Sequence, residues 1–248
     1  MPLHPAHRVV GYTFLLHRKH SDTPLTGKTR SGSSGVLIMT EHTGTHIDAL
    51  CHQAYNHRLY GNVEVTPYVE TPYGFKRHGI ETVEPIVGRG VLLDVAANQG
   101  VEYLPKHHRV SAMELQKCAA VEGVEVRKGD VVLVRTGYGR FWNDAARYEE
   151  AAGVSPDGAR WLATVGARSV GADNMAWEVD DGTVDRELGV TLPCHALMLV
   201  DHGIHIIENM SLEQLGAEKV YEFFFVCTPL KFVGATGSPV RPIAITGL

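Results

Sequence analysis

The sequence lacks the features that would place the chain in a membrane, on nucleic acid or in a secreted class. No apolar stretch approaches the roughly 18 residues that a membrane-spanning helix needs. The first five residues do not show the charged-then-apolar layout of a signal peptide. There is no long Lys/Arg run, and the net charge is −5, which argues against a nucleic-acid-binding surface. We therefore expect a cytoplasmic protein with no membrane or nucleic-acid partner.

Cysteine pairs are also missing. The chain has only four cysteines, which are far apart and form no Cys-x-x-Cys motif: Cys51, Cys118, Cys194 and Cys227. This distribution favours free thiols in a reducing compartment over a disulfide framework. Complete P-loop, nucleophile-elbow, dinucleotide-binding and His-Glu-x-x-His motifs are absent as well. Cys51, beside a histidine, is more simply a small buried thiol than a nucleophile.

The composition is that of an ordinary globular protein, with 44% hydrophobic and 21% charged residues. No internal repeat or Pro/Gly-rich linker divides the sequence, so we expect a single domain over residues 1–248. Apolar and β-branched runs bounded by Gly, Pro or Asp predict strands. These runs are Val9–Leu16, Gly35–Thr40, Val91–Val95, Val131–Thr136, Ala196–Val200, Tyr221–Val226 and Val240–Ile245.

Three helices are predicted from their starting signals. Ser111 with Glu114, and Ser211 with Gln214, have the spacing of capping boxes. Ser155 is followed by a proline and an acid, which is typical of a capped first turn. Strands outnumber helices and do not alternate strictly with them. We therefore predict an α/β (or α+β) fold with a mixed, barrel-like sheet and flanking helices.

Histidine is the residue present in unusual number, with 14 against 23 Lys and Arg together. Four chemistry-bearing residues lie in one short run: His42, His46, Asp48 and His52. All four positions have the same parity, so an extended segment would turn their side chains to one side. Alternatively, Asp48 and His52 lie four apart, as on one helical turn. Either geometry would cluster the set.

Three imidazoles and one carboxylate suit a borderline divalent ion such as Zn²⁺ or Mn²⁺. They do not suit an iron–sulfur cluster or a dedicated Ca²⁺ cage. Two histidines and a carboxylate, with positions left open for water, form a catalytic type of site. A histidine-rich surface loop is the simpler alternative, but the added acid and third histidine favour a metal site.

A second cluster lies in an otherwise apolar segment and contains His195, Asp201, His202, His205 and Glu208. A buried carboxylate needs a partner, so Glu208, between isoleucines and a methionine, is a candidate ligand or hydrogen-bond anchor. It could equally be an acid at the start of the helix expected after Ser211. Local reasoning does not decide between the two.

The run from His42 to His52 resembles the signature of the metal-dependent cyclase family, His-x-Gly-Thr-His-x-Asp-x-Pro-x-His. That family includes bacterial kynurenine formamidase and isatin hydrolase. Weaker matches follow in the right order over most of the chain. They cover residues 90–94, 128–137, 160–163, 171–173, His195 with 206–209, 223–230 and 237–242.

The resemblance implies that His42, His46 and Asp48 hold a divalent metal, Mn²⁺ or Zn²⁺, as one or two ions. In the two-metal formamidases the aspartate bridges to a second ion, which here His195 and Glu208 would hold. His52 would be the general acid/base. The implied fold is a mixed α/β domain with a barrel-like sheet, assembled as a homodimer or larger homo-oligomer.

The implied activity is hydrolysis of a C–N bond in a small-molecule substrate, either a cyclic amide such as isatin or an aryl formamide. A lactonase or polyketide-type cyclase using the same metal is the first alternative. A non-catalytic, metal-stabilised binding protein is the second, although a purely structural site would not need a spare base. Leu50 replaces the signature proline, and the chain has extra length between the family-like blocks. Both features favour an isatin-hydrolase-like or an uncharacterised branch. The family's Asp-Leu-(Ser/Thr) opening is also missing.

Overall fold

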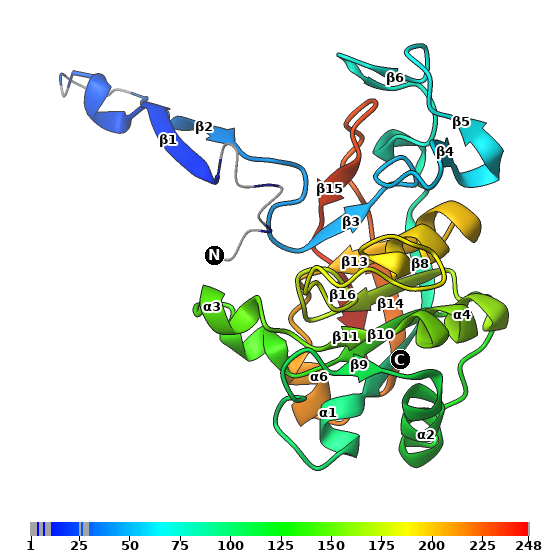
Figure 1. Ribbon diagram of the computed structural model, residues 1–248. Helices are drawn as coiled ribbons and strands as arrows, with labels where there is room; N and C mark the ends of the chain where they lie inside the picture. The colour runs from blue at the N-terminus through cyan, green and yellow to red at the C-terminus, as the bar shows by residue number, and fades with distance from the viewer. Residues whose placement is uncertain (1–3, 5–6, 8–10, 25, 27–29, 248) are drawn as a thin grey trace.

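Eight strands form one mixed sheet that curls into half a barrel, and this sheet carries the rest of the structure (Figure 1). The computed structural model describes residues 4, 7, 11–24, 26 and 30–247. The strands, in order across the sheet, are β15 (Gly237–Pro239), β3 (His46–Asp48), β13 (His205–Glu208), β12 (Ser169–Ala172), β10 (Val131–Arg135), β8 (Ile86–Asp94), β14 (Glu222–Cys227) and β16 (Ile243–Ile245).

The four central strands, β13, β12, β10 and β8, run parallel to one another. On one side of them, β3 pairs antiparallel with β13, and β15 pairs antiparallel with β3. On the other side, β14 pairs antiparallel with β8, and β16 pairs antiparallel with β14. The predicted mixed sheet with flanking helices is therefore confirmed. The described strands do not close on themselves, because β15 and β16 remain at opposite edges of the order.

Both faces of the sheet are buried, which explains why its strands read as continuous apolar runs. Along β10, Val132 and Val134 enter one hydrophobic core, while Val131 and Leu133 enter the other. The first core is covered by helices and contains Leu115 of one helix and Leu162 of another. The central strands are thus held from both sides, which gives the site a rigid base.

The helices are few and short. They are α1 (Val95–Asn98), α2 (Ala112–Glu122), α3 (Ala145–Tyr148), α4 (Pro156–Val165), α5 (Pro193–His195) and α6 (Glu213–Ala217). The capping box at Ser111 is confirmed, since Ser111 and Glu114 satisfy each other's backbone N–H groups. Ser155 caps α4, with Pro156 in its first turn, also as predicted. Both α2 and α4 end at glycines in the left-handed conformation.

Two sequence predictions are wrong. Residues Ala196–Val200 do not form a strand but continue α5 as a π-helical segment, Ala196–Asp201. A short, fully buried apolar run has the same pattern in a helix as in a strand, so periodicity could not separate them. The predicted capping box at Ser211 is also wrong, because α6 begins at Glu213 after Leu212, with no side-chain cap.

The other predicted strands are present with shifted ends. The first is displaced to β1 (Thr13–Arg18), while Val9 and Val10 lie outside the described residues. It pairs with β2 (Ser34–Ile38). The remaining short pairs are β4 (Arg58–Leu59) with β5 (Val63–Glu64), β6 (Glu70–Thr71) with β7 (Gly74–Phe75), and β9 (Arg109–Val110) with β11 (Gly153–Val154).

No helix in the described part of the chain is long and apolar enough to cross a bilayer.

The β1–β2 ribbon projects away from the rest of the chain (Figure 1). Every residue of both strands is exposed. The ribbon connects the N-terminal segment with the loop that leads to His42, so it lies in sequence between the N-terminus and the first candidate ligand.

Candidate metal centre

Strand β3 is the element around which the candidate site is built. It lies between β13 and β15, and its three residues are fully or almost fully buried. Antiparallel pairing places His46 directly opposite Glu208 of β13. Asp48 lies opposite Gly237 of β15. A Cβ at Gly237 would come within 2.8 Å of His42 Cε1, so glycine leaves the space that the His42 ring occupies.

The structure brings together all six residues that the sequence singled out. His42, His46, Asp48, His195 and Glu208 are buried, and His52 is partly so. Asp48 Oδ1 lies 3.0 Å from His42 Nδ1 and 3.6 Å from His46 Nε2. Asp48 Oδ2 lies 3.6 Å from His195 Nε2. Glu208 contacts Nε2 of both His46 and His195, at 3.2 and 3.1 Å.

Each of the three candidate imidazole ligands has one nitrogen facing the centre and the other fixed by an acceptor. His42 Nε2 lies 2.9 Å from Thr236 Oγ1, which in turn donates to Glu41. His46 Nδ1 lies 2.9 Å from the carbonyl oxygen of Gly44. Donation to these acceptors leaves the inward nitrogen free to bind a metal.

The third imidazole is fixed most strongly. Glu178 Oε1 lies 2.8 Å from His195 Nδ1 and also accepts a hydrogen bond from the His195 backbone N–H. Its other oxygen accepts the backbone N–H of Cys194. A carboxylate paired with a histidine in this way sets the tautomer and orientation of a metal ligand.

Asp48 is the least satisfied group of the cluster. Its side chain is about 1% exposed, and neither carboxylate oxygen has a hydrogen-bond partner. His42 Nδ1, although 3.0 Å from Asp48 Oδ1, is also without a hydrogen bond, so the contact lacks suitable geometry. A buried carboxylate without partners is costly. A cation placed among these atoms would satisfy them, so the donor set fits a divalent ion.

The carboxylates and imidazoles of the centre shift one another's pKa values. Burial opposes the charged form of His46, but Glu208 outweighs it and raises the pKa of His46 to about 9. Glu178 and Glu208 likewise overcome burial and raise the pKa of His195 well above its usual value. Burial would raise the pKa of Glu208, yet hydrogen bonds from His195 and His46 hold it well below its usual value.

His52 differs from the other histidines. Burial lowers its pKa to about 3, so the ring is neutral at neutral pH. Its ring centroid lies 4.1 Å from that of His42 and 6.1 Å from that of His195. Gln53 Nε2 lies 3.3 Å from His52 Nε2. A neutral imidazole at the edge of the site can accept a proton.

Three overlapping sets of ligand atoms lie within 4.8 Å of one another among the described residues. The first is His42, His46 and Asp48, the second is Asp48, His52 and His195, and the third is His7, His42 and His52. Asp48 belongs to the first and second sets, so it would be available to an ion in either. His52 belongs to the second and third sets and lies at the edge of the centre.

The same-parity argument holds for only part of the run. Only His46 and Asp48 lie on a strand, whereas His42 lies in the preceding turn. His52 follows β3 in a turn closed by its backbone N–H to the carbonyl of Ala49, not in a helical turn. Leu50, which replaces the signature proline, packs against the core. The turn therefore forms without the proline.

The second cluster divides into ligand candidates and supports. His195 and Glu208 both lie at the centre. Glu208 ends strand β13 and contacts His46 and His195, so it is not an acid at the start of a helix. His205 Nδ1 lies 2.8 Å from the Asp48 backbone carbonyl and so supports β3. Asp201 and His202 are exposed and take no part.

Cys51 is not placed to act as a nucleophile. Burial raises the pKa of its thiol to about 12, which removes the reactive thiolate at neutral pH. All four cysteines are buried and free, as the sequence predicted.

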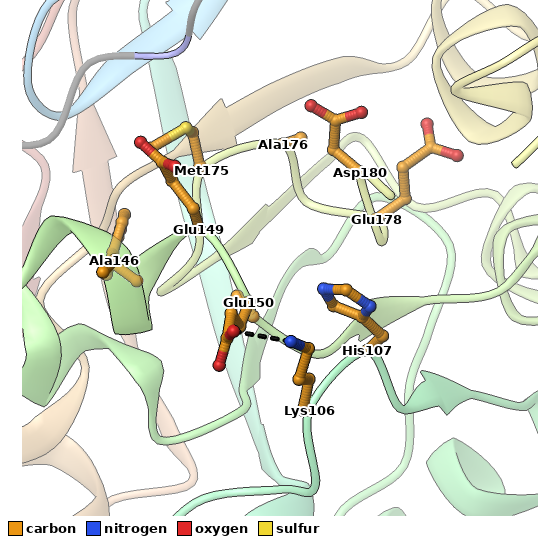
Figure 2. A pocket seen from close by; sticks show the side chains of 11 residues that line it. Lys106, His107, Ala146, Glu149, Glu150, Met175, Ala176, Glu178 and Asp180 are labelled. Carbon is orange, nitrogen blue, oxygen red and sulfur yellow. Dashed lines mark hydrogen bonds and ion pairs between the residues drawn. The ribbon is translucent and has the colours of Figure 1, made fainter. Parts of the chain in front are cut away.

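Sequence reasoning missed the groups that hold the ligands. Glu178 and Thr236 carry no spacing signal, because they lie far along the chain from the histidines that they orient. The supporting role of Tyr148 was not predicted either. Its hydroxyl donates a hydrogen bond to Oδ1 of Asn209, the residue that follows Glu208. A cavity of about 420 Å³ adjoins these supporting residues, and Tyr148 is part of its lining. Glu178 also lines it (Figure 2).

Comparisons with known proteins point to one family. The Cyclase family model, described as "Putative cyclase", matches residues 4–179. The chain is 30% identical over 235 residues to a kynurenine formamidase of Bacillus cereus, covering 90% of this chain and 88% of the relative.

Solved structures show the same fold. One described as a novel cyclase matches with a TM-score of 0.85 and 27% identity, covering 99% of this chain and 82% of that chain. Isatin hydrolase A from Ralstonia solanacearum matches with a TM-score of 0.69 and 21% identity, covering 97% and 85%. At that identity the second likeness supports the fold alone.

Metal affinity should rise with pH, because His46 and His195 must lose protons to become ligands. With the pKa of His46 at about 9 in the metal-free protein, we expect Zn²⁺ affinity to increase about tenfold per pH unit between pH 6 and 8 for each proton displaced. Calorimetry in buffers of different protonation enthalpy measures the protons released. Glu178→Gln should release fewer protons, because it removes a charge that holds the His195 proton. Affinity independent of pH would contradict this assignment.

Proposed function

This chain belongs to the cyclase family, and from that premise we propose that it is a metal-dependent hydrolase acting on the C–N bond of a small amide. The observation that carries the proposal is the convergence of three oriented imidazole nitrogens on Asp48, a buried carboxylate without hydrogen-bond partners. His42, His46 and Asp48 would hold one ion, and Asp48, His195 and Glu208 a second. A kynurenine formamidase among the matched relatives favours an aryl formamide as substrate, and the departure from the family signature at Leu50 keeps a cyclic amide as the second candidate.

A divalent ion supplies Lewis-acid activation of water and of the substrate carbonyl. The residues of the chain then position and move the proton. His52 has a neutral ring that lies beside those of His42 and His195. Its position is that of a group that would accept the proton of the attacking water and deliver it to the leaving nitrogen. Positioned proton transfer of this kind contributes roughly 10²–10⁴-fold to the rate.

The proposed activity should depend on metal. We expect protein stripped of metal and reloaded with Mn²⁺ or Zn²⁺ to hydrolyse isatin or N-formylkynurenine, while the stripped protein does not. Asp48→Asn, which changes a buried carboxylate at the centre, should lose both bound metal and turnover. Turnover of a lactone but of neither amide would favour the lactonase alternative. Bound metal without hydrolysis of any of these substrates would count against hydrolysis.

Substitution of His52 should affect catalysis without affecting metal binding, unlike substitution of a metal ligand. His52→Ala is expected to lower kcat by roughly 10²–10⁴-fold while leaving metal content unchanged by elemental analysis. His202→Ala is a matched control, because His202 is an exposed histidine of the second cluster. Loss of one metal equivalent in His52→Ala would show that His52 is a ligand rather than the acid/base.

We also propose that the chain forms a homodimer or higher homo-oligomer through the β1–β2 ribbon. The ribbon is apolar on both faces, since the pairs Phe14–Leu37 and Leu15–Val36 lie on opposite sides of it. These four side chains are 40–57% exposed. An isolated two-stranded hairpin is marginally stable in water, so packing against a second copy would stabilise it.

If the protein assembles through the ribbon, a charge placed on the apolar ribbon surface should weaken self-association. Leu15→Lys should weaken self-association by about tenfold or more, because burying an unpaired charge in an apolar contact is costly. Light scattering coupled to size exclusion measures the mass of the assembly. Met113→Lys is the matched control, since Met113 is an exposed apolar residue, 77% accessible, on α2. A wild-type monomer at high concentration, or an unaltered assembly in Leu15→Lys, would reject this surface.

A further inference from the structure

His42 is the one candidate ligand of the first metal set that no regular element holds. His46 and Asp48 lie on β3, between two paired strands. His42 lies in the turn before them, close to Gly44, whose φ of +70° marks the left-handed region. A loop-borne ligand needs fixing by its surroundings if the site is to keep its geometry. The hydrogen bond to Thr236 fixes one nitrogen of the ring but leaves its faces to other contacts.

His7 provides a contact to one of those faces. The rings of His7 and His42 are stacked, with centroids 4.4 Å apart and planes within 17° of parallel. His7 also approaches His52, with a centroid distance of 6.0 Å. The ring of His7 therefore lies against the metal centre from a part of the chain that neither the signature run nor the second cluster includes.

His7 could either bind a metal ion itself or support the ring of His42, and the stacked geometry distinguishes these two roles. Nitrogens of His7, His42 and His52 lie within 4.8 Å of one another, a distance that alone would allow all three to bind an ion. However, the lone pairs of an imidazole lie in the ring plane, so two parallel stacked rings do not point them at one atom. Tetrahedral ligands must converge on the ion. His7 is thus placed to support His42 rather than to share its metal.

His7 is connected by hydrogen bonds, through His4, to Asp180. Asp180 lies in the same loop as Glu178, which contacts His195. The His7 backbone N–H donates to the carbonyl of His4, at 2.8 Å. His4 Nε2 lies 2.8 Å from Asp180 Oδ2. Asp180 is two residues after Glu178, which orients His195, and both carboxylates lie along the same stretch of chain at the cavity (Figure 2). One loop therefore reaches both sides of the metal centre.

We propose that His7 is a positioning residue for the metal ligand His42, held by the His4–Asp180 pair, so that the loop carrying Glu178 and Asp180 fixes ligands on both sides of the centre. This role rests on the proposed metal site and extends it to residues outside the signature. Glu178 acts directly on His195. Asp180 acts on His42 through His4 and the stacked ring of His7.

The test measures metal binding, not only turnover. In His7→Ala we expect Co²⁺ or Zn²⁺ affinity, measured by calorimetry, to fall about 3–10-fold, the range of one aromatic stacking contact. The absorption bands of bound Co²⁺ should shift, because His42 would be less fixed. His7→Phe keeps a ring without a nitrogen and should restore affinity to within about twofold of wild type. Asp180→Asn should show a smaller change in the same direction.

The control is His17→Ala, which removes an exposed histidine of the β1–β2 ribbon and should leave metal binding unchanged. Equal affinity in wild type and His7→Ala would overturn the positioning role while leaving the metal site intact. Equal losses in His7→Ala and His7→Phe would show that the His7 nitrogen is needed, and would overturn stacking as the cause. A wild-type protein that binds no divalent ion would instead reject the metal site itself, and the role of His7 with it.

Discussion

The burial of two carboxylates side by side is the constraint on which the centre depends. Asp48 and Glu208 both lie in the interior, and each approaches His195 and His46. Two buried anions repel each other and lose hydration, so they require positive charge nearby. In the metal-free protein the imidazoles of His46 and His195 supply it by holding protons, as their raised pKa values show. A divalent cation would supply the same charge while releasing those protons, and would also satisfy Asp48.

The fold meets this constraint through strand register rather than through the signature run alone. Antiparallel pairing of β3 with β13 places His46 opposite Glu208, although the two are far apart in sequence. A shift of one residue would turn the side chains of β3 to the other face. The apolar residue between the two ligands, Ile47, is fully buried and pairs with Ile207 of β13. Core packing of Ile47 thus fixes the register that the metal centre needs.

The sequence predicted which residues cluster at the centre better than it predicted the residues that surround them. His42, His46, Asp48 and His52 lie within one short run, so spacing alone indicated that they cluster. His195 was expected only through the family resemblance, and Glu208 was undecided locally. Glu178, Thr236 and His7 could not be predicted, because their contacts with the ligands arise from tertiary folding and leave no local pattern. The strand assigned to Ala196–Val200 failed for a related reason, since burial on every side hides the period that separates helix from strand.

The replacement of the signature proline by Leu50 shows which part of the signature the site requires. A proline would restrict the backbone of the turn between Asp48 and His52. Here the backbone N–H of His52 donates to the Ala49 carbonyl, and the Leu50 side chain packs against the helix-covered core. Hydrogen bonding and apolar packing thus fix the turn without the stiffness of a proline ring. The turn therefore places the His52 ring beside those of His42 and His195 without a proline at this position.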